Sequence, residues 1–314
     1  MTTRVILILV ASLFFLSACF SSSSSDDESL TERDRAEAAA SAAVLSGSID
    51  PPDDDDDDEG VGNMGPLGNS KARIQQAFEI CDTGSVESGT DTRDSLYTQS
   101  GEIGVEWNYY QDCVQGAETE FAMTTDGYQA YGDAEDWTVS YMRWTGSPDQ
   151  PLDADGAFVT GFPGGEWRIR GSMHSCDECQ SEGFPIFDDQ GFLRWEVEGE
   201  GERVVFQYGE PNNFFHTRAE DMETHVSQSI DGYVGILWEG TPCDLEVEYT
   251  TLENMIISDF GTRDEVIQSG RLNLDIRGGG SYEVEFQDGQ VFLDGQLVEP
   301  DENNPCAGAF ELTF

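Results

Sequence analysis

Apolar and polar residues alternate in many short segments between residues 71 and 314. The segments 137–144, 166–170, 192–198 and 272–277 place apolar or aromatic side chains at nearly every second position. Successive side chains of a strand point to opposite faces, so this alternation is typical of strands buried on one face. No long helical pattern intervenes to build parallel βαβ units. The sequence therefore predicts an all-β antiparallel domain of roughly a dozen strands.

Pairs of Asp and Gly separate several of these segments. Asp126-Gly127, Asp231-Gly232 and Asp288-Gly289 suit type I′ hairpin turns, because both residues of each pair tolerate positive φ. We therefore expect tight antiparallel connections within one domain covering residues 71–314, a length that one β domain can reach. A meander, a sandwich and a barrel all fit this pattern. The short amphipathic stretch at 72–80 is the only candidate helix there.

The N-terminus has the pattern of an export signal. Arg4 precedes an apolar run over 5–16, and the small residues Ser17 and Ala18 precede Cys19. The run is too short to span a hydrocarbon core, which takes about 20 apolar residues. An ordinary secretory signal peptide is one interpretation.

The quartet Leu16-Ser17-Ala18-Cys19 resembles the lipobox of bacterial lipoproteins. The resemblance implies a signal peptide at 1–18 and a lipid-modified Cys19 as first residue of the mature chain. In that family an Asp after the cysteine often marks retention in the inner membrane, and here the position holds Phe20. We therefore expect a lipid anchor in the bacterial cell envelope, in the outer membrane, with the domain facing the periplasm or the surface.

Residues 19–70 read as a lipid-anchored linker. The segment contains Ser21 to Ser25, an Ala-rich stretch at 36–43 and six consecutive aspartates at 53–58. Low hydrophobicity and like charge predict disorder. The Ala-rich part favours a helix, but an isolated helix of that length is marginal in water. We therefore expect a disordered, acidic linker that holds the folded domain away from the membrane.

The charge of the chain limits its partners. It has 63 acidic and 15 basic residues, a formal net charge of −48, and Lys71 is its only lysine. Such a field repels nucleic-acid phosphates and anionic lipids, so we predict no nucleic-acid binding and a membrane contact made only through lipid. The charge is explained by solubility or a salty environment, or by a role in binding a ligand.

The cysteines other than Cys19 form an even set of six. In an exported protein this predicts three disulfides, and six cysteines leave 15 possible pairings. Order and spacing favour the three pairs Cys81 with Cys113, Cys176 with Cys179, and Cys243 with Cys306.

The segment His174-Ser-Cys-Asp-Glu-Cys179 is the densest group of reactive side chains. A local disulfide is the first interpretation, because thiols pair in an oxidising compartment. A metal site using His174, Cys176 and Cys179, with His216 or His225 as fourth ligand, and a redox pair are the alternatives.

Two further binding hypotheses rest on less. Asp153 and Asp155 are weak candidates for calcium ligands, although their segment does not fit an EF-hand loop. An aromatic platform for sugar rings is the second, and strand-face packing is its alternative explanation. Its candidate residues are Trp107, Tyr109, Tyr110, Trp137, Tyr141 and Trp144.

No motif of a known catalytic type stands out. The chain has no Gly-x-Ser-x-Gly, no His-Glu-x-x-His and no P-loop, so we predict that it is not an enzyme and needs no cofactor. The leading hypothesis is a lipid-anchored envelope lipoprotein with a structural or binding β domain, whose partner is an envelope glycan or protein. Alternatives are a calcium-assisted carbohydrate-binding or adhesion module, and a redox or metal protein built on His174, Cys176 and Cys179.

Overall fold

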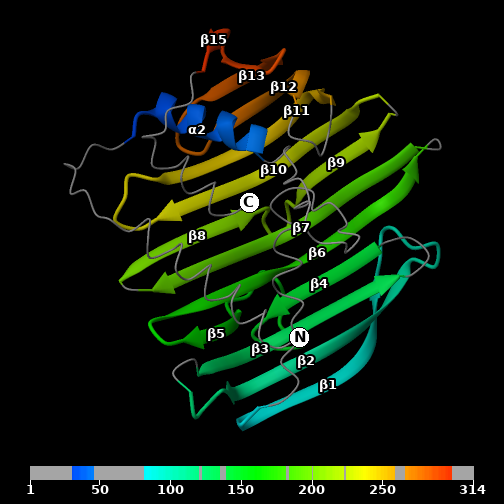
Figure 1. Cartoon of the computed structure of the whole chain (residues 1–314), viewed down its shortest axis with the longest axis vertical. Helices are drawn as coiled ribbons and strands as arrows, with labels where there is room; N and C mark the ends of the chain where they lie inside the picture. The colour runs from blue at the N-terminus through cyan, green and yellow to red at the C-terminus, as the bar shows by residue number, and fades with distance from the viewer. Residues whose placement is uncertain are drawn as a thin grey trace.

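The computed structural model describes residues 30–45, 81–119, 122–134, 139–181, 184–199, 201–222, 224–258 and 266–298. These residues form one continuous antiparallel sheet with a helix packed on it (Figure 1). The all-β prediction is confirmed. Of the three arrangements that fit the sequence, the strands adopt an open meander that runs from β1 at one edge to β15 at the other. The amphipathic stretch 72–80 lies outside the described residues.

The strands follow one another through the sheet mostly in chain order. They are β1 (Thr83–Asp94), β2 (Glu102–Gln115), β3 (Met123–Ala134), β4 (Val139–Thr145), β5 (Phe158–Phe162), β6 (Gly165–Ser181), β7 (Phe184–Gly199), β8 (Glu202–Tyr208), β9 (Phe215–Asp221), β10 (Val226–Trp238), β11 (Asp244–Ser258), β12 (Val266–Ile276), β13 (Ser281–Gln287), β14 (Gln290–Leu293) and β15 (Gln296–Leu297).

Two positions in the sheet are each filled by a pair of short strands. β4 and β5 both lie between β3 and β6, and β8 and β9 both lie between β7 and β10. Each pair amounts to one long strand that is interrupted by a loop, at residues 146–157 in the first case and 209–214 in the second. The meander thus stays regular while two loops leave its middle.

The prediction of hairpin turns at Asp126-Gly127 and Asp231-Gly232 was wrong. Both pairs lie inside strands, in β3 and β10, where the neighbouring position changes from one short strand to the other. Gly127 and Gly232 have φ of 109° and 110°, a backbone conformation that favours glycine. A Cβ on Gly127 would lie 2.9 Å from the Cα of Phe158, so the interruption itself demands glycine.

The aspartates of these pairs brace the neighbouring strand on the other side. Oδ1 of Asp126 accepts a 2.6 Å hydrogen bond from the amide of Asp112, where the β2 register shifts. Oδ1 of Asp231 accepts a 2.8 Å bond from the amide of Thr251 at an irregularity in β11. The two segments therefore share one arrangement, with a glycine at the strand interruption and an aspartate that binds a bulge in the next strand.

The third pair, Asp288-Gly289, behaves as predicted. Both residues have positive φ, 50° and 77°, and they connect β13 to β14. Asp294-Gly295 makes a second such turn, with φ of 49° and 73°, between β14 and β15. The Asp-Gly signal is reliable where the flanking segments are short and no strand interruption competes for the glycine.

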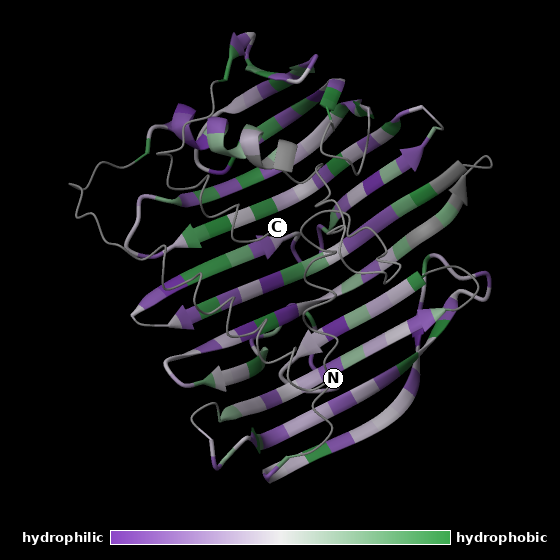
Figure 2. Ribbon diagram, in the orientation of Figure 1, coloured by the Kyte–Doolittle hydropathy of each residue, from purple (hydrophilic) through white to green (hydrophobic). Residues whose placement is uncertain are grey.

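Alternation along the strands gives the sheet two different faces (Figure 2). We call the more apolar one the core face. Its fully buried members come from strands along most of the sheet, as expected when every second side chain points the same way. Large members include Trp144, Met173, Leu193, Phe215, Met255 and Leu272.

Helix α2 (Glu32–Leu45) covers part of the core face, over β11, β12 and β14 (Figure 1). Ala36, Ala39 and Ala40 have no exposed surface, because a methyl side chain lets helix and sheet approach closely. Tyr249 in β11 donates a 2.9 Å hydrogen bond to the carbonyl of Ala39. The prediction of a disordered linker was thus wrong for residues 30–45: a helix that is marginal alone is stabilised by packing. The remainder of 19–70, with Cys19, lies outside the described residues.

Two predicted disulfides are confirmed, Cys81–Cys113 and Cys176–Cys179. Cys243 is also disulfide-bonded, and Cys306, the partner predicted for it, lies outside the described residues. In the described part of the chain, no helix is long and apolar enough to cross a membrane.

Candidate functional site on the loop face

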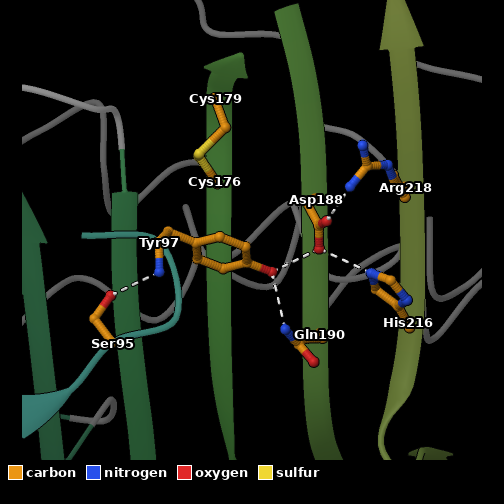
Figure 3. The surroundings of a disulfide bond; sticks show 8 residues. All are labelled: Ser95, Tyr97, Cys176, Cys179, Asp188, Gln190, His216 and Arg218. Carbon is orange, nitrogen blue, oxygen red and sulfur yellow. Dashed lines mark hydrogen bonds and ion pairs between the residues drawn. A yellow bond between two sulfur atoms is a disulfide. The ribbon is translucent and has the colours of Figure 1, made fainter. Parts of the chain in front are cut away.

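The second face of the sheet, which we call the loop face, carries the tip of the β1–β2 hairpin. The tip, residues 95–101, is closed by a 3.0 Å bond from the amide of Ser95 to the carbonyl of Gly101. Tyr97 lies across β6 and points toward β7 (Figure 3). It packs on a small apolar cluster formed by Ile103, Val105, Val139, Tyr141 and Cys176.

Asp188 in β7 is the centre of a polar network beneath this tip (Figure 3). Its Oδ1 accepts a 2.6 Å bond from the phenol of Tyr97 and lies 2.9 Å from Nε2 of His216. Its Oδ2 lies 3.4 Å from Nη1 of Arg218. Gln190 donates through Nε2 to the Tyr97 oxygen at 3.2 Å. A carboxylate that is 8% exposed thus has neutral and cationic partners on three sides.

Strand register brings these residues together. In β7, Asp188 pairs with Arg218 of β9 and Gln190 pairs with His216. On the other side, the same residues pair with Cys176 and His174 of β6. Directly paired residues in an antiparallel sheet point to the same face, so residues from three strands form two adjacent rows. Only Tyr97 reaches the network from a distant part of the chain.

The network favours a charged Asp188 and a protonated His216. Burial raises the pKa of the Asp188 carboxyl, but hydrogen bonds from His216 and Tyr97 outweigh it and hold that pKa below its usual value. The hydrogen bond to Asp188 raises the pKa of His216 against the opposing effect of burial. Burial, and then the bond to Asp188, raise the pKa of Tyr97. The phenol therefore stays protonated and donates the hydrogen bond that holds the hairpin tip on the sheet.

The Cys176–Cys179 disulfide lies beside this network on β6 (Figure 3). It bridges a register shift between Asp177 and Cys179, where β6 bulges against β7. Cys176 has no exposed surface. Because both sulfurs are bonded to each other, they are not free to act as thiolate ligands.

The histidines proposed as metal ligands do not converge. His174 lies edge-on against Tyr141, with ring centroids 4.9 Å apart, and burial lowers its pKa. His174 and His216 both pair with Gln190, so they stand two strand spacings apart, about 10 Å. His225 contacts Thr224 near the start of β10. Within the described residues, no three His, Cys, Asp or Glu side chains gather to hold a metal ion.

The loops that interrupt the sheet also lie on the loop face. In loop 146–157, the carbonyl of Gln150 accepts a hydrogen bond from Arg143 in β4. In loop 209–214, Asn213 donates a 2.9 Å bond to Glu248 in β11. With the hairpin tip they border the centre of β6 and β7. Asp153 and Asp155, the calcium candidates, are exposed on the first of these loops.

The six aromatic residues predicted as a sugar platform are divided between the two faces. Tyr110 and Trp144 are buried in the core cluster, and Tyr141 is buried on the loop face. Trp107 and Tyr109 are half-exposed on β2, where they pair with loop-face residues of β3. Trp137 lies outside the described residues.

Comparison with protein-family models, curated proteins and solved structures found no match. What the chain does must therefore be inferred from its own geometry. The loop face has buried polar groups, three bordering loops and arginines, and loops held on a rigid scaffold commonly carry binding residues.

Most of the Asp188 network was missed by sequence reasoning. His174, His216 and the cysteines were singled out, but Tyr97, Asp188, Gln190 and Arg218 were not. One signal was present: Asp188 and Asp189 directly follow the apolar run at 184–187. Two adjacent acids there predict a buried, partnered carboxylate.

Proposed function

We propose that this chain is a lipid-anchored lipoprotein of the bacterial cell envelope, and that its β domain binds a ligand on the loop face without turning it over. The observation that supports binding is the gathering of three loops on one face of a rigid sheet. Loops 95–101, 146–157 and 209–214 are each held to that face by a side-chain hydrogen bond. Rigid strands that carry fixed loops suit recognition, because little order is lost when a ligand binds.

The anchor is supported by the sequence alone, through the lipobox and the spacing of Cys19 behind the apolar run. The test is expression of the full chain and of Cys19→Ala in a bacterium supplied with a labelled fatty acid. We expect label and membrane association in the wild type and loss of both in the variant. Equal labelling of the two chains would contradict the anchor.

Binding at the loop face is tested with two matched tryptophan variants. Gln190→Trp adds bulk on the loop face beside the phenol of Tyr97, whereas Thr250→Trp adds the same bulk on an exposed position of β11. A ligand of the native state raises the melting temperature. We expect an envelope-extract fraction or glycan that stabilises the wild type and Thr250→Trp, but not Gln190→Trp. Equal stabilisation of both variants by the ligand would show that the binding site is not on the loop face. Conversion of the ligand to a product would show that the protein is an enzyme.

A carbohydrate-binding role is the second candidate, favoured by one observation. The ring of Trp107 lies against Gly89 of β1, where a Cβ would come within 2.5 Å of it, and its centroid is 6.1 Å from that of Tyr128. A half-exposed indole held in this way can stack on a sugar ring. Trp107→Ala is expected to abolish binding in a glycan screen, and a flat screen with the wild type would end this candidate.

A further inference from the structure

Arginines gather on the loop face of the central strands. Directly paired positions place Arg143 of β4, Arg168 and Arg170 of β6, Arg194 of β7, Arg203 of β8 and Arg218 of β9 on this side. The whole chain has only 15 basic residues against 63 acidic ones. A random surface of this composition would be dominated by carboxylates, so the gathering has a local cause.

Four of these arginines have carboxylate partners. Arg168 is paired with Glu166, Arg194 with Glu196, Arg203 with Glu196 and Glu239, and Arg218 with Asp188. These ion pairs join residues of the same strand or of neighbouring strands, and the carboxylates neutralise the charge of these four arginines.

Arg143 and Arg170 differ from the other four. Within the described part of the chain, neither has a carboxylate at ion-pair distance, and the Nε atom of each is buried with no hydrogen-bond partner. Arg143 donates one bond, to the carbonyl of Gln150. A guanidinium carries several N–H donors and no acceptor, so most of the donors of both side chains have no protein acceptor among the described residues.

Arg143 and Arg170 occupy neighbouring positions on the loop face. Arg143 pairs with Ser172, two residues along β6 from Arg170, so the two arginines are diagonal neighbours on one face, about 7–8 Å apart at Cα. Arg170 also stands directly opposite Arg194, whose charge is offset by Glu196 at 2.8 Å. The Arg170 guanidinium lies over the ring of Phe192, 5.6 Å from its centroid, which holds it in place.

No acid forms an ion pair with Arg143 or Arg170 among the described residues. Asp153 and Asp155 of loop 146–157 act on Arg170 only through space, and both are exposed to water. Their attraction for Arg170 exceeds the repulsion from Arg194, but exposure to water weakens it. In the described part of the chain, Arg143 and Arg170 therefore keep guanidinium donors that no carboxylate contacts.

We propose that Arg143, Arg170 and the hydroxyl of Ser172 form a binding site for a phosphate-like dianion, such as the phosphate group of an envelope molecule. Two guanidinium groups match the charge of a phosphate monoester, and their planar donors suit bidentate contact with its oxygens. Ser172 of β6 pairs directly with Arg143 and is two residues from Arg170, so its hydroxyl lies on the same face as both arginines. This inference rests on the proposed function, because it names the ligand class of the same face.

The experiment measures binding of inorganic phosphate to the full chain, by calorimetry and by melting temperature. Sulfate, acetate and the neutral sugar maltose are compared at equal ionic strength, made up with sodium chloride. Variants are Arg170→Gln, Arg143→Gln and the matched control Arg168→Gln, which removes an arginine two residues away on the same face. Near-ultraviolet circular dichroism checks that each variant is folded, and Arg170→Lys keeps the charge without the planar donors.

We expect phosphate and sulfate to bind better than acetate, and Arg170→Gln to weaken phosphate binding by about tenfold or more. Arg168→Gln should bind phosphate within about twofold of the wild type. No phosphate effect beyond that of chloride, or equal losses in Arg168→Gln and Arg170→Gln, would overturn the site. If maltose or a glycan binds the loop face while phosphate does not, the phosphate site is contradicted and the proposed function stands. If, in addition, Gln190→Trp prevents the binding of no ligand, the phosphate site and the proposed function are both contradicted.

Discussion

The phenol of Tyr97 donates a 2.6 Å hydrogen bond to Asp188 although the two residues are 91 positions apart. The bond joins the tip of the first hairpin to the middle of the sheet. The Tyr97 ring crosses β6 beside the Cys176–Cys179 bridge, and its hydroxyl group faces Asp188, next to His216 and Arg218 (Figure 3). One contact thus links the edge of the meander to its centre.

Tyr97→Phe is expected to lower the free energy of unfolding by about 1.5–3 kcal/mol, because a buried carboxylate loses a hydrogen bond. Urea unfolding measures the change, and limited proteolysis reports opening of the tip. The control is Tyr109→Phe, a phenol on the same face with no hydrogen bond in the described part of the chain, expected to stay within about 0.5 kcal/mol. Equal losses in the two variants would show that the Asp188 bond contributes nothing.

Stability should depend on pH through Asp188 and His216. Asp188 has a lowered pKa in the folded protein, so its contribution is present above about pH 4 and is lost as pH falls through the folded value. His216 has a raised pKa, so its contribution is present below about pH 6.5 and is lost as pH rises through the folded value. The pair therefore stabilises most in mildly acidic solution.

His216→Gln tests this directly. Its melting temperature should fall furthest below that of the wild type near pH 5–6, and the gap should narrow by about pH 9. His225→Gln, whose ring contacts the Thr224 hydroxyl, is the control and should follow the wild-type curve. A gap that widens steadily with rising pH would contradict the pairing of His216 with Asp188.

The two described disulfides should differ in their effect on stability. Cys81 and Cys113 are 32 residues apart, whereas Cys176 and Cys179 are 3 apart. Loop-closure entropy predicts a loss of about 4 kcal/mol when the first is replaced by alanines, and about 2 kcal/mol for the second. Denaturant unfolding of the two double-alanine variants gives the order. A larger loss of stability in the variant that replaces Cys176 and Cys179 would show that this disulfide does more than close a short bulge.

Helix α2 should resist enlargement of its buried face. Ala39→Leu inserts bulk where the side chain has no exposed surface, and overpacking of this kind costs about 1–3 kcal/mol. Amide exchange over residues 32–45 should accelerate as the helix is displaced. Ser41→Leu, at a half-buried position of the same helix, is the control and should change stability by less than about 0.5 kcal/mol. Unchanged exchange in Ala39→Leu would show that α2 is not packed as described.

Gly127 and Gly232, which lie where the neighbouring strand is interrupted, should not tolerate a side chain. Gly127→Ala and Gly232→Ala force alanine into φ near 110° and against neighbouring backbone, for an expected loss of about 1–3 kcal/mol each. Gly104→Ala is the control, since nothing lies within 4 Å of a Cβ there. Unfolding transitions that coincide for all three variants would contradict the role assigned to the interruptions.

Several parts of this structure were predictable because their causes are local. Alternating side chains predicted strands, Asp288-Gly289 predicted a turn from the φ angles it tolerates, and cysteine parity predicted pairing. The same Asp-Gly signal was wrong at Asp126 and Asp231, because there the glycine serves an interrupted neighbouring strand. A local pattern holds no information about which strand lies alongside.

The sequence by itself determined an antiparallel β domain, the residues able to form its core, and the expectation of a lipidated Cys19, since periodicity, turn propensity and signal spacing act over short distances. Only the tertiary structure decided that α2 packs on the sheet, that Tyr97 reaches Asp188, and that Arg143 and Arg170 are neighbours with no carboxylate partner among the described residues. Those contacts depend on strand order and register, which bring residues far apart in the chain onto one face. The physical reason is that the surroundings of a side chain in a sheet are set mainly by neighbouring strands.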